Sequence, residues 1–205
     1  MDWNVHMIEN VQNWLLPKGD TVLDEHFLML FGNPYLFQRE RFFAHFYSVE
    51  PVGVFYRCRV RDISICCCPS LFGGPMTAMY LEVLARCGVK DIIACGYVGG
   101  LSEEALIGSY VLPTIAHAYD GTTRNYAPYT HTFPAAPSLL EALHIAINGR
   151  PIKCTSTPIA IIDALLLEDD DLIATFNEQG IGCIDLETAC LYALAKRYGI
   201  RAASI

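Results

Sequence analysis

Basic residues are scarce in this chain. Its 205 residues include only 14 lysines and arginines against 22 acidic residues, which gives a formal net charge of −8. The nearest approach to a basic cluster is the scattered trio Arg57, Arg59 and Arg61. A protein that binds nucleic acid needs a basic surface to neutralise phosphates, so nucleic acid is disfavoured as a partner.

Long apolar runs are missing as well. No stretch approaches the roughly 20 apolar residues that a membrane-spanning helix needs. The first residues carry Asp2 and Glu9 and lack the basic segment and apolar run of a secretory signal. We therefore expect no membrane partner and a cytoplasmic location.

Metal-binding cysteine pairs are absent too. The chain has nine cysteines, but none are spaced as CxxC, and most lie inside apolar runs. The adjacent residues Cys66, Cys67 and Cys68 cannot all face one metal ion, because neighbours on a strand point to opposite faces. We expect buried thiols, no metal site and no bound cofactor.

What the chain does have is apolar content: 53% of its residues are hydrophobic, enough for one domain over residues 1–205 with a substantial core. Apolar segments of strand length alternate with segments of helical period, which predicts an α/β fold. Strands are expected at 52–60, 63–68, 109–118, 152–162, 181–184 and from 201. Helices are expected from Gly73 to a stop at Gly88, at 37–46, 139–147, 169–179 and 186–198.

The stretch 91–101 organises this pattern. A short apolar run, read as a buried central strand, ends in Gly96, Gly99 and Gly100. If the helix from Gly73 crosses between two parallel strands, the Gly73–Gly74 loop and the Gly96 turn meet at one sheet edge, where ligands bind in open α/β sheets. The polar and aromatic segment 120–128 is predicted to be a binding loop.

Two carboxylates, Asp185 and Glu187, flank the junction of the strand 181–184 and the last helix. Asp185 is best interpreted as a helix cap. Glu187 lies in the first helical turn, where a carboxylate can accept two hydrogen bonds from neighbouring hydroxyls. The residues alone thus indicate an α/β enzyme for a small polyhydroxylated ligand.

Four segments resemble, in order and spacing, the trimeric and hexameric nucleoside phosphorylases, a family that includes uridine phosphorylase and bacterial-type purine nucleoside phosphorylase. The matching segments are Gly32-Asn33-Pro34, the helix and strand from Gly74-Pro75-Met76 to Ile93, the stretch from Asp120-Gly121-Thr122-Thr123 to Pro128, and Asp185-Leu186-Glu187-Thr188-Ala189. The resemblance covers residues 32–205.

The resemblance implies a three-layer fold, in which a twisted mixed β-sheet is surrounded by helices, and a homo-oligomer whose neighbouring subunit completes the site. It implies cleavage of a nucleoside to free base and ribose 1-phosphate, with inorganic phosphate as co-substrate. Ribose would be held by Glu187, Leu186 and Asp185, and phosphate would lie near Gly32, Gly96, Tyr97 and Arg41. Thr123 and Arg124 would belong to the base-binding loop.

Several positions depart from the family pattern. The phosphate-binding arginine of the central strand falls on Ala94, a hydroxyl residue falls on Tyr97, and another arginine falls near Leu36, so that Arg39 or Arg41 would have to replace it. The chain also stops at Ile205, before the aspartate that protonates purines in the family, and we interpret the domain as truncated at its C-terminal end.

These departures keep three hypotheses open. The chain is a nucleoside phosphorylase-like enzyme, a nucleosidase that uses water as the nucleophile, or a catalytically silent nucleoside-binding or scaffold protein. The sequence leaves the choice of base undetermined.

Overall fold

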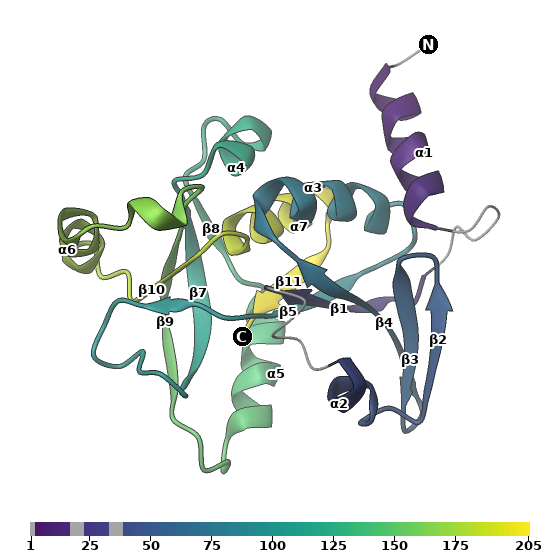
Figure 1. The fold of residues 1–205 in the computed structure, drawn as a ribbon, viewed down its shortest axis with the longest axis horizontal. Helices are drawn as coiled ribbons and strands as arrows, with labels where there is room; N and C mark the ends of the chain where they lie inside the picture. Colours follow the sequence, from purple (N-terminus) through teal and green to yellow (C-terminus); the bar gives the residue numbers. More distant parts are fainter. Residues whose placement is uncertain (1–2, 17–22, 33–38) are drawn as a thin grey trace.

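The computed structural model describes residues 3–16, 23–32 and 39–205, and it has two mixed β-sheets with helices on both sides (Figure 1). The helices are α1 (Trp3–Leu15), α2 (Arg39–Phe43), α3 (Gly73–Leu84), α4 (Gly121–Tyr126), α5 (Pro137–Ile147), α6 (Asp170–Glu178) and α7 (Thr188–Tyr198), with a 3₁₀ turn η1 (Leu165–Leu167). The strands are β1 (His26–Phe31), β2 (Ser48–Val52), β3 (Phe55–Val60), β4 (Ile63–Leu71), β5 (Asp91–Cys95), β6 (Gly99–Gly100), β7 (Tyr110–Ala118), β8 (Thr132–Pro134), β9 (Cys154–Ile161), β10 (Cys183–Asp185) and β11 (Arg201–Ser204).

The first sheet has the order β11-β5-β1-β4-β3-β2. Its strands β11, β5, β1 and β4 run parallel, and β3 and β2 extend it antiparallel. The second sheet has the order β6-β10-β9-β7-β8, with three parallel central strands and antiparallel edges. The predicted α/β fold class is confirmed. The strands form two separately hydrogen-bonded mixed sheets, where the sequence predicted one.

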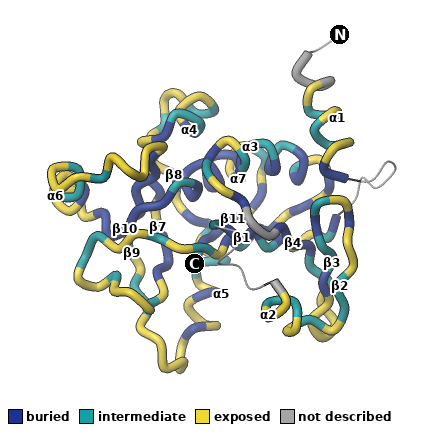
Figure 2. The backbone as a smooth tube through the Cα atoms, viewed as in Figure 1, coloured by how far each residue is buried: buried dark blue, intermediate teal, exposed yellow. Residues whose placement is uncertain are grey.

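The core lies between the helix pair α3 and α7 and the first sheet, and it continues along α7 onto the second sheet. Helices α3 and α7 lie side by side on one face of the first sheet, while α5 and α2 lie on the other (Figure 1). Seven of the nine cysteines are buried, and all nine are free thiols. Figure 2 shows the burial concentrated in α7 and in the central strands, where the parallel strands are covered on both faces.

The β4–α3–β5 connection is the crossover that the sequence predicts. Strands β4 and β5 both pair parallel to β1, which lies between them. Their carboxyl ends therefore lie at the same sheet edge, where the end of β1 stands between the turns after Leu71 and Cys95. The hairpin predicted around residues 61–62 also forms, with Arg61 at a φ of 53°.

Some elements differ from the sequence-based expectation. The strand predicted at 52–60 is divided at Gly53, whose φ of +64° turns the chain between β2 and β3. Strand β1 was not anticipated, and segment 120–128 contains the short helix α4 where a loop was expected. Pro113 lies at a register shift of β7, as a bulged position requires. Asn33, Pro34 and Leu36 lie outside the described residues.

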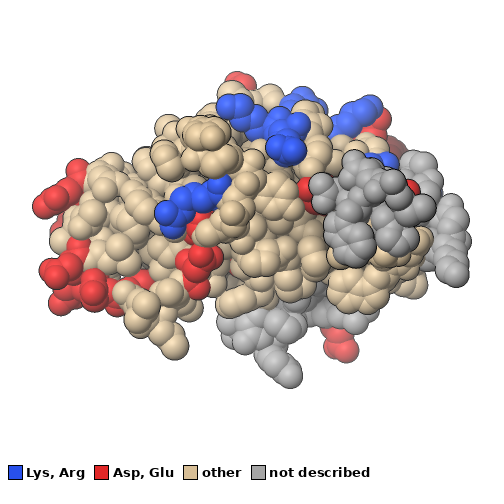
Figure 3. Space-filling view, turned by 90° about the horizontal axis from the view of Figure 1, so that it is seen from above, with Lys and Arg blue, Asp and Glu red and all other residues tan. Residues whose placement is uncertain are grey.

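Charge is unevenly distributed on the surface. Acidic side chains gather at the end of the molecule that carries α6, and basic side chains gather away from it (Figure 3). Within the described ranges, no helix is both long and apolar enough to cross a membrane.

Candidate functional site

Asp185 ends strand β10 and caps helix α7. Its Oδ1 accepts hydrogen bonds from the backbone N–H groups of Glu187 and Thr188, each at 3.2 Å, and the Thr188 hydroxyl donates to Oδ2. These donors are the groups that the start of a helix leaves without intrahelical partners. Asp185 thus supplies capping hydrogen bonds from two residues before the N-cap position, which Glu187 occupies instead of the first helical turn expected for it. The Asp185 carboxylate is engaged by the chain itself.

Glu187 lies where the beginnings of α3 and α7 meet. Only 5% of the residue is exposed. Its Oε1 accepts a hydrogen bond from the Gly73 N–H at 2.7 Å, and its Oε2 accepts one from the Leu186 N–H at 3.3 Å. The carboxylate is thus held in place at the positive ends of two helix dipoles. The contact joins residues 114 positions apart, and no local pattern in the sequence indicates it.

Burial sets the protonation of both carboxyl groups. Burial, followed by the negative charge of Asp185, raises the pKa of Glu187 to about 7. Burial also raises the pKa of Asp185 to about 6, although the hydrogen bonds from Thr188 and Glu187 oppose the shift. Glu187 therefore changes its charge near neutral pH, a property typical of functional carboxyl groups.

A third carboxyl group, Asp120, lies nearby and was not singled out from the sequence. It is fully buried, its Oδ2 accepts a hydrogen bond from the Thr123 N–H at 2.7 Å, and its negative charge raises the pKa of Asp185. Within the described residues its Oδ1 has no hydrogen-bond partner. An aspartate directly before a helix is a capping signal, and that signal marks Asp120 in the sequence.

Cys190 lies close enough to Asp120 and Glu187 to be influenced by the charges of both. Its thiol donates to the Gly74 carbonyl at 3.3 Å, and burial together with the charges of Asp120 and Glu187 raises its pKa. A protonated thiol at this position packs the start of α3 against α7.

Gly32, Gly96 and Tyr97 follow strands β1 and β5. A Cβ atom on Gly96 would lie 2.8 Å from the Phe31 Cβ, so a glycine is needed for the two chains to approach. A Cβ atom on Gly32 would lie 3.6 Å from the Tyr97 ring, which places the 72% exposed tyrosine beside this turn. The Gly32 N–H donates to Leu71 O at 2.9 Å and the Gly96 N–H to Ile205 O at 3.1 Å, so both donors are already bonded within the chain.

The predicted base-loop residues face different surroundings. Thr123 is fully buried in α4. Arg124 is exposed, and its guanidinium donates from Nε to the Asp120 carbonyl at 3.0 Å and from Nη2 to the Tyr119 carbonyl. Arg124 therefore stabilises the α4 turn, and contacts of either residue with a base remain a prediction.

Leu186 and Arg41 complete the predicted set. Leu186 is half-buried against the cluster that contains Phe176 and Ile184, beside the Glu187 carboxylate. Arg41 is exposed on α2, where the neighbouring Phe43 packs on Tyr56 of β3 with ring centroids 4.8 Å apart. A contact of Arg41 with phosphate stays a prediction, and Arg39 has no described side chain.

The sequence profile of the Phosphorylase superfamily matches residues 33–205. The chain belongs to this superfamily. It is 32% identical over 146 residues to guanosine phosphorylase of Halorubrum lacusprofundi, a match that covers 70% of this chain and 59% of the relative. It is also 32% identical over 117 residues to uridine phosphorylase of Treponema pallidum, covering 55% of this chain and 44% of that protein. This superfamily member thus spans less than two thirds of the length of either relative.

Solved structures agree with this superfamily's fold. Uridine phosphorylase from Vibrio fischeri ES114 superposes with a TM-score of 0.80 at 21% identity, covering 87% of this chain and 76% of that one. AMP nucleosidase from Bacteroides thetaiotaomicron superposes with a TM-score of 0.79 at 22% identity, and the match covers 96% of this chain and 87% of that one. At these identities the similarity establishes the shared fold.

Proposed function

We propose that the chain cleaves the N-glycosidic bond of a nucleoside with inorganic phosphate, releasing the free base and ribose 1-phosphate. Such an enzyme is a pentosyltransferase. The observation that carries the proposal is the buried Glu187 carboxylate, oriented by the Gly73 and Leu186 N–H groups. The chain's membership of the superfamily and its similarity to guanosine and uridine phosphorylases support the same reaction.

The geometry suits recognition of a ribose. Each oxygen of Glu187 accepts one backbone N–H and has further lone pairs, so the carboxylate can accept hydrogen bonds from two vicinal hydroxyls. As the C1′–N bond breaks, its electrons pass to the base and positive charge develops on the sugar, which an adjacent anion stabilises. A phosphate oxygen then forms the new bond to C1′. Leu186 and Tyr97 are proposed to line the sugar pocket.

Water is the alternative nucleophile. Ala94, which is fully buried, occupies the position where the resemblance expects an arginine, and the Gly32 and Gly96 N–H groups already have acceptors. A phosphate dianion normally needs arginine side chains or free N–H groups. These observations favour a nucleosidase as the second candidate function.

A nucleoside panel distinguishes these functions. Guanosine, inosine, adenosine and uridine are incubated with the purified protein, with and without phosphate, and free base and ribose 1-phosphate are quantified. Ribose 1-phosphate that forms only with phosphate supports the proposal. Base released equally without phosphate identifies a nucleosidase, and no release from any nucleoside contradicts both.

The Glu187→Gln variant tests the proposed site itself. A hydrogen bond from a hydroxyl to a charged group is worth about 1.5–3 kcal/mol, so kcat/KM should fall at least about tenfold. Glu141→Gln, at an exposed position on α5, is the matched control and should retain the activity of the unmodified protein.

We also propose a homo-oligomer. Large apolar side chains are exposed at Leu106 and Ile107, and again at Leu165–Leu167. Exposed apolar residues in groups mark association surfaces. Light scattering coupled to size exclusion should report a mass of more than one 22.8 kDa chain.

A further inference from the structure

A cavity of about 410 Å³ lies at the ends of α3 and α7 that are farther from Glu187. Glu187 stands where these two helices begin, whereas the cavity is lined by Glu82 near the end of α3 and by Arg197 and Tyr198 at the end of α7. Its volume is within the range of small-molecule sites. The proposed nucleoside site does not use this cavity.

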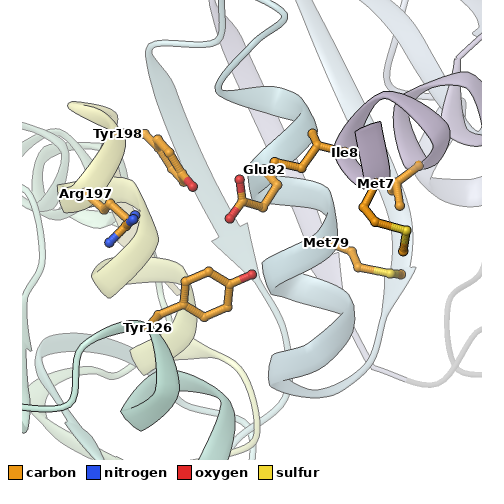
Figure 4. Close-up of a pocket in the computed structure, with 8 residues that line it drawn as sticks. Met7, Ile8, Met79, Glu82, Tyr126, Arg197 and Tyr198 are labelled. Atoms are coloured by element: carbon orange, nitrogen blue, oxygen red, sulfur yellow. The ribbon is translucent and has the colours of Figure 1, made fainter. Parts of the chain in front are cut away.

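The polar groups of the cavity converge on one carboxylate. Figure 4 shows the hydroxyls of Tyr126 and Tyr198 pointing toward the Glu82 carboxylate. Burial and then the charge of Glu82 raise the pKa of Tyr126 to about 12, so this hydroxyl is neutral at physiological pH. In the part of the chain that the structure describes, no lysine or arginine nitrogen lies within 4.0 Å of Glu82. The hydroxyls that face the carboxylate are therefore neutral, and Arg197 is the basic residue among those that line the cavity.

The remaining wall of the cavity is apolar and pliable. It consists of Met7, Ile8 and Val11 on α1 and Met79 on α3. Methionine side chains adapt to flexible aliphatic groups, and the faces of tyrosine rings attract cations. A carboxylate between two tyrosines, beside a methionine-rich wall, matches a positively charged head on an aliphatic chain.

We propose that this cavity binds a small aliphatic amine. Its ammonium group donates hydrogen bonds to Glu82 and to the Tyr126 and Tyr198 oxygens, and its chain packs on the wall formed by α1 and Met79. Arg197 interacts with the Tyr198 side chain, and its guanidinium lies 6.0 Å from the centre of that ring. Because Arg197 is exposed, solvent and salt screen its repulsion of the ligand.

Calorimetric titration of the full chain with three six-carbon probes tests the charge requirement. Hexylamine should bind saturably, 1-hexanol at least about tenfold more weakly, and hexanoate more weakly still, because a charge-assisted hydrogen bond contributes about ten- to hundredfold in affinity. Equal binding of hexylamine and hexanol, or no saturable binding of hexylamine, would overturn the proposal. Tighter binding of Nα-acetyl-lysinamide than of hexylamine would assign the cavity to a protein's lysine side chain instead.

Two variants remove charges of opposite sign and should change hexylamine binding differently, which a general loss of folding would not do. Glu82→Gln should weaken hexylamine at least about tenfold, Tyr198→Phe should weaken it several-fold, and Arg197→Gln should leave it unchanged or tighten it. Glu141→Gln on α5 is the control with the same chemical change at a distant exposed position. Weaker hexylamine binding in Arg197→Gln, or unchanged binding in both Glu82→Gln and Tyr198→Phe, would contradict the assignment. Loss of structure is monitored by thermal unfolding.

Discussion

Replacing Glu187 by glutamine should stabilise the fold above neutral pH, even though it impairs the proposed function. The folded-state pKa of Glu187 is raised to about 7 from an ordinary value of 4.5. Between these two pH values the unfolded chain releases the proton while the folded chain retains it. Stability therefore falls as the pH rises from 4.5 to about 7, and the full penalty is present above pH 7.

The size of the effect follows from the same two values. At about 1.36 kcal/mol per pH unit, the raised pKa corresponds to a penalty of about 3.4 kcal/mol. Glutamine retains a carbonyl oxygen for the Gly73 N–H but loses one charged acceptor, the partner of the Leu186 N–H, which costs about 1 kcal/mol. The variant should therefore be more stable than the unmodified protein by about 2 kcal/mol at pH 8, and no more stable at pH 4.5.

Urea unfolding at a series of pH values from 4.5 to 8.5 measures this difference directly. The gap between the two proteins should open between pH 5 and 7 and then stay constant. Glu178→Gln, at an exposed position on α6, provides the control and should show no pH-dependent gap. A Glu187→Gln variant that is less stable at pH 8, or a gap independent of pH, would refute the view that burial of this charge destabilises the fold.

Three further predictions concern the same region. The KM for a nucleoside should fall as the pH rises through about 7, because ionised Glu187 accepts hydrogen bonds more strongly, and initial rates of Glu187→Gln should lack this dependence. Gly96→Ala should lower the free energy of unfolding by about 2–3 kcal/mol, because the new Cβ would lie 2.8 Å from the Phe31 Cβ. Gly88→Ala, at a φ of +87° with no atom nearby, should cost only about 1 kcal/mol. Equal losses in chemical unfolding would contradict the clash. Thr188→Ala should lower the free energy of unfolding by about 1–2 kcal/mol, because it removes a hydroxyl donor to Asp185. Thr188→Ser keeps the hydroxyl and should retain most of that stability. Equal stability of the two variants would be inconsistent with the hydrogen bond.

Local chemistry accounts for the elements that could be predicted. Gly199 adopts a φ of 69° at the end of α7, as a glycine after a helical period predicts, and Asp169 caps α6 with its side chain on the Leu172 N–H. Strand β5 is a short apolar run closed by glycine. In each case the signal lies within a few residues of the element, so the sequence suffices.

The missed elements have equally physical reasons. Strand β1 is a six-residue segment with five apolar residues in a row, and without alternation such a segment is compatible with strand or helix. Helix α4 forms because Asp120 accepts the Thr123 N–H and Arg124 binds two carbonyls, contacts that compete with the loop conformation that polar and aromatic composition favours.

The sequence by itself determined that Asp185 and Glu187 stand between a buried strand and a helix, and that a capping carboxylate precedes α7. It also determined the fold class, because alternating strand and helix periods leave few ways to bury the apolar faces. Only the tertiary structure decided that the Gly73 N–H meets Glu187, that Asp120 lies close enough to influence Asp185, and that burial raises the pKa of Glu187 to about 7. Such long-range contacts and the solvent exclusion around them arise from the packing of α3 against α7, and no local pattern of residues specifies them.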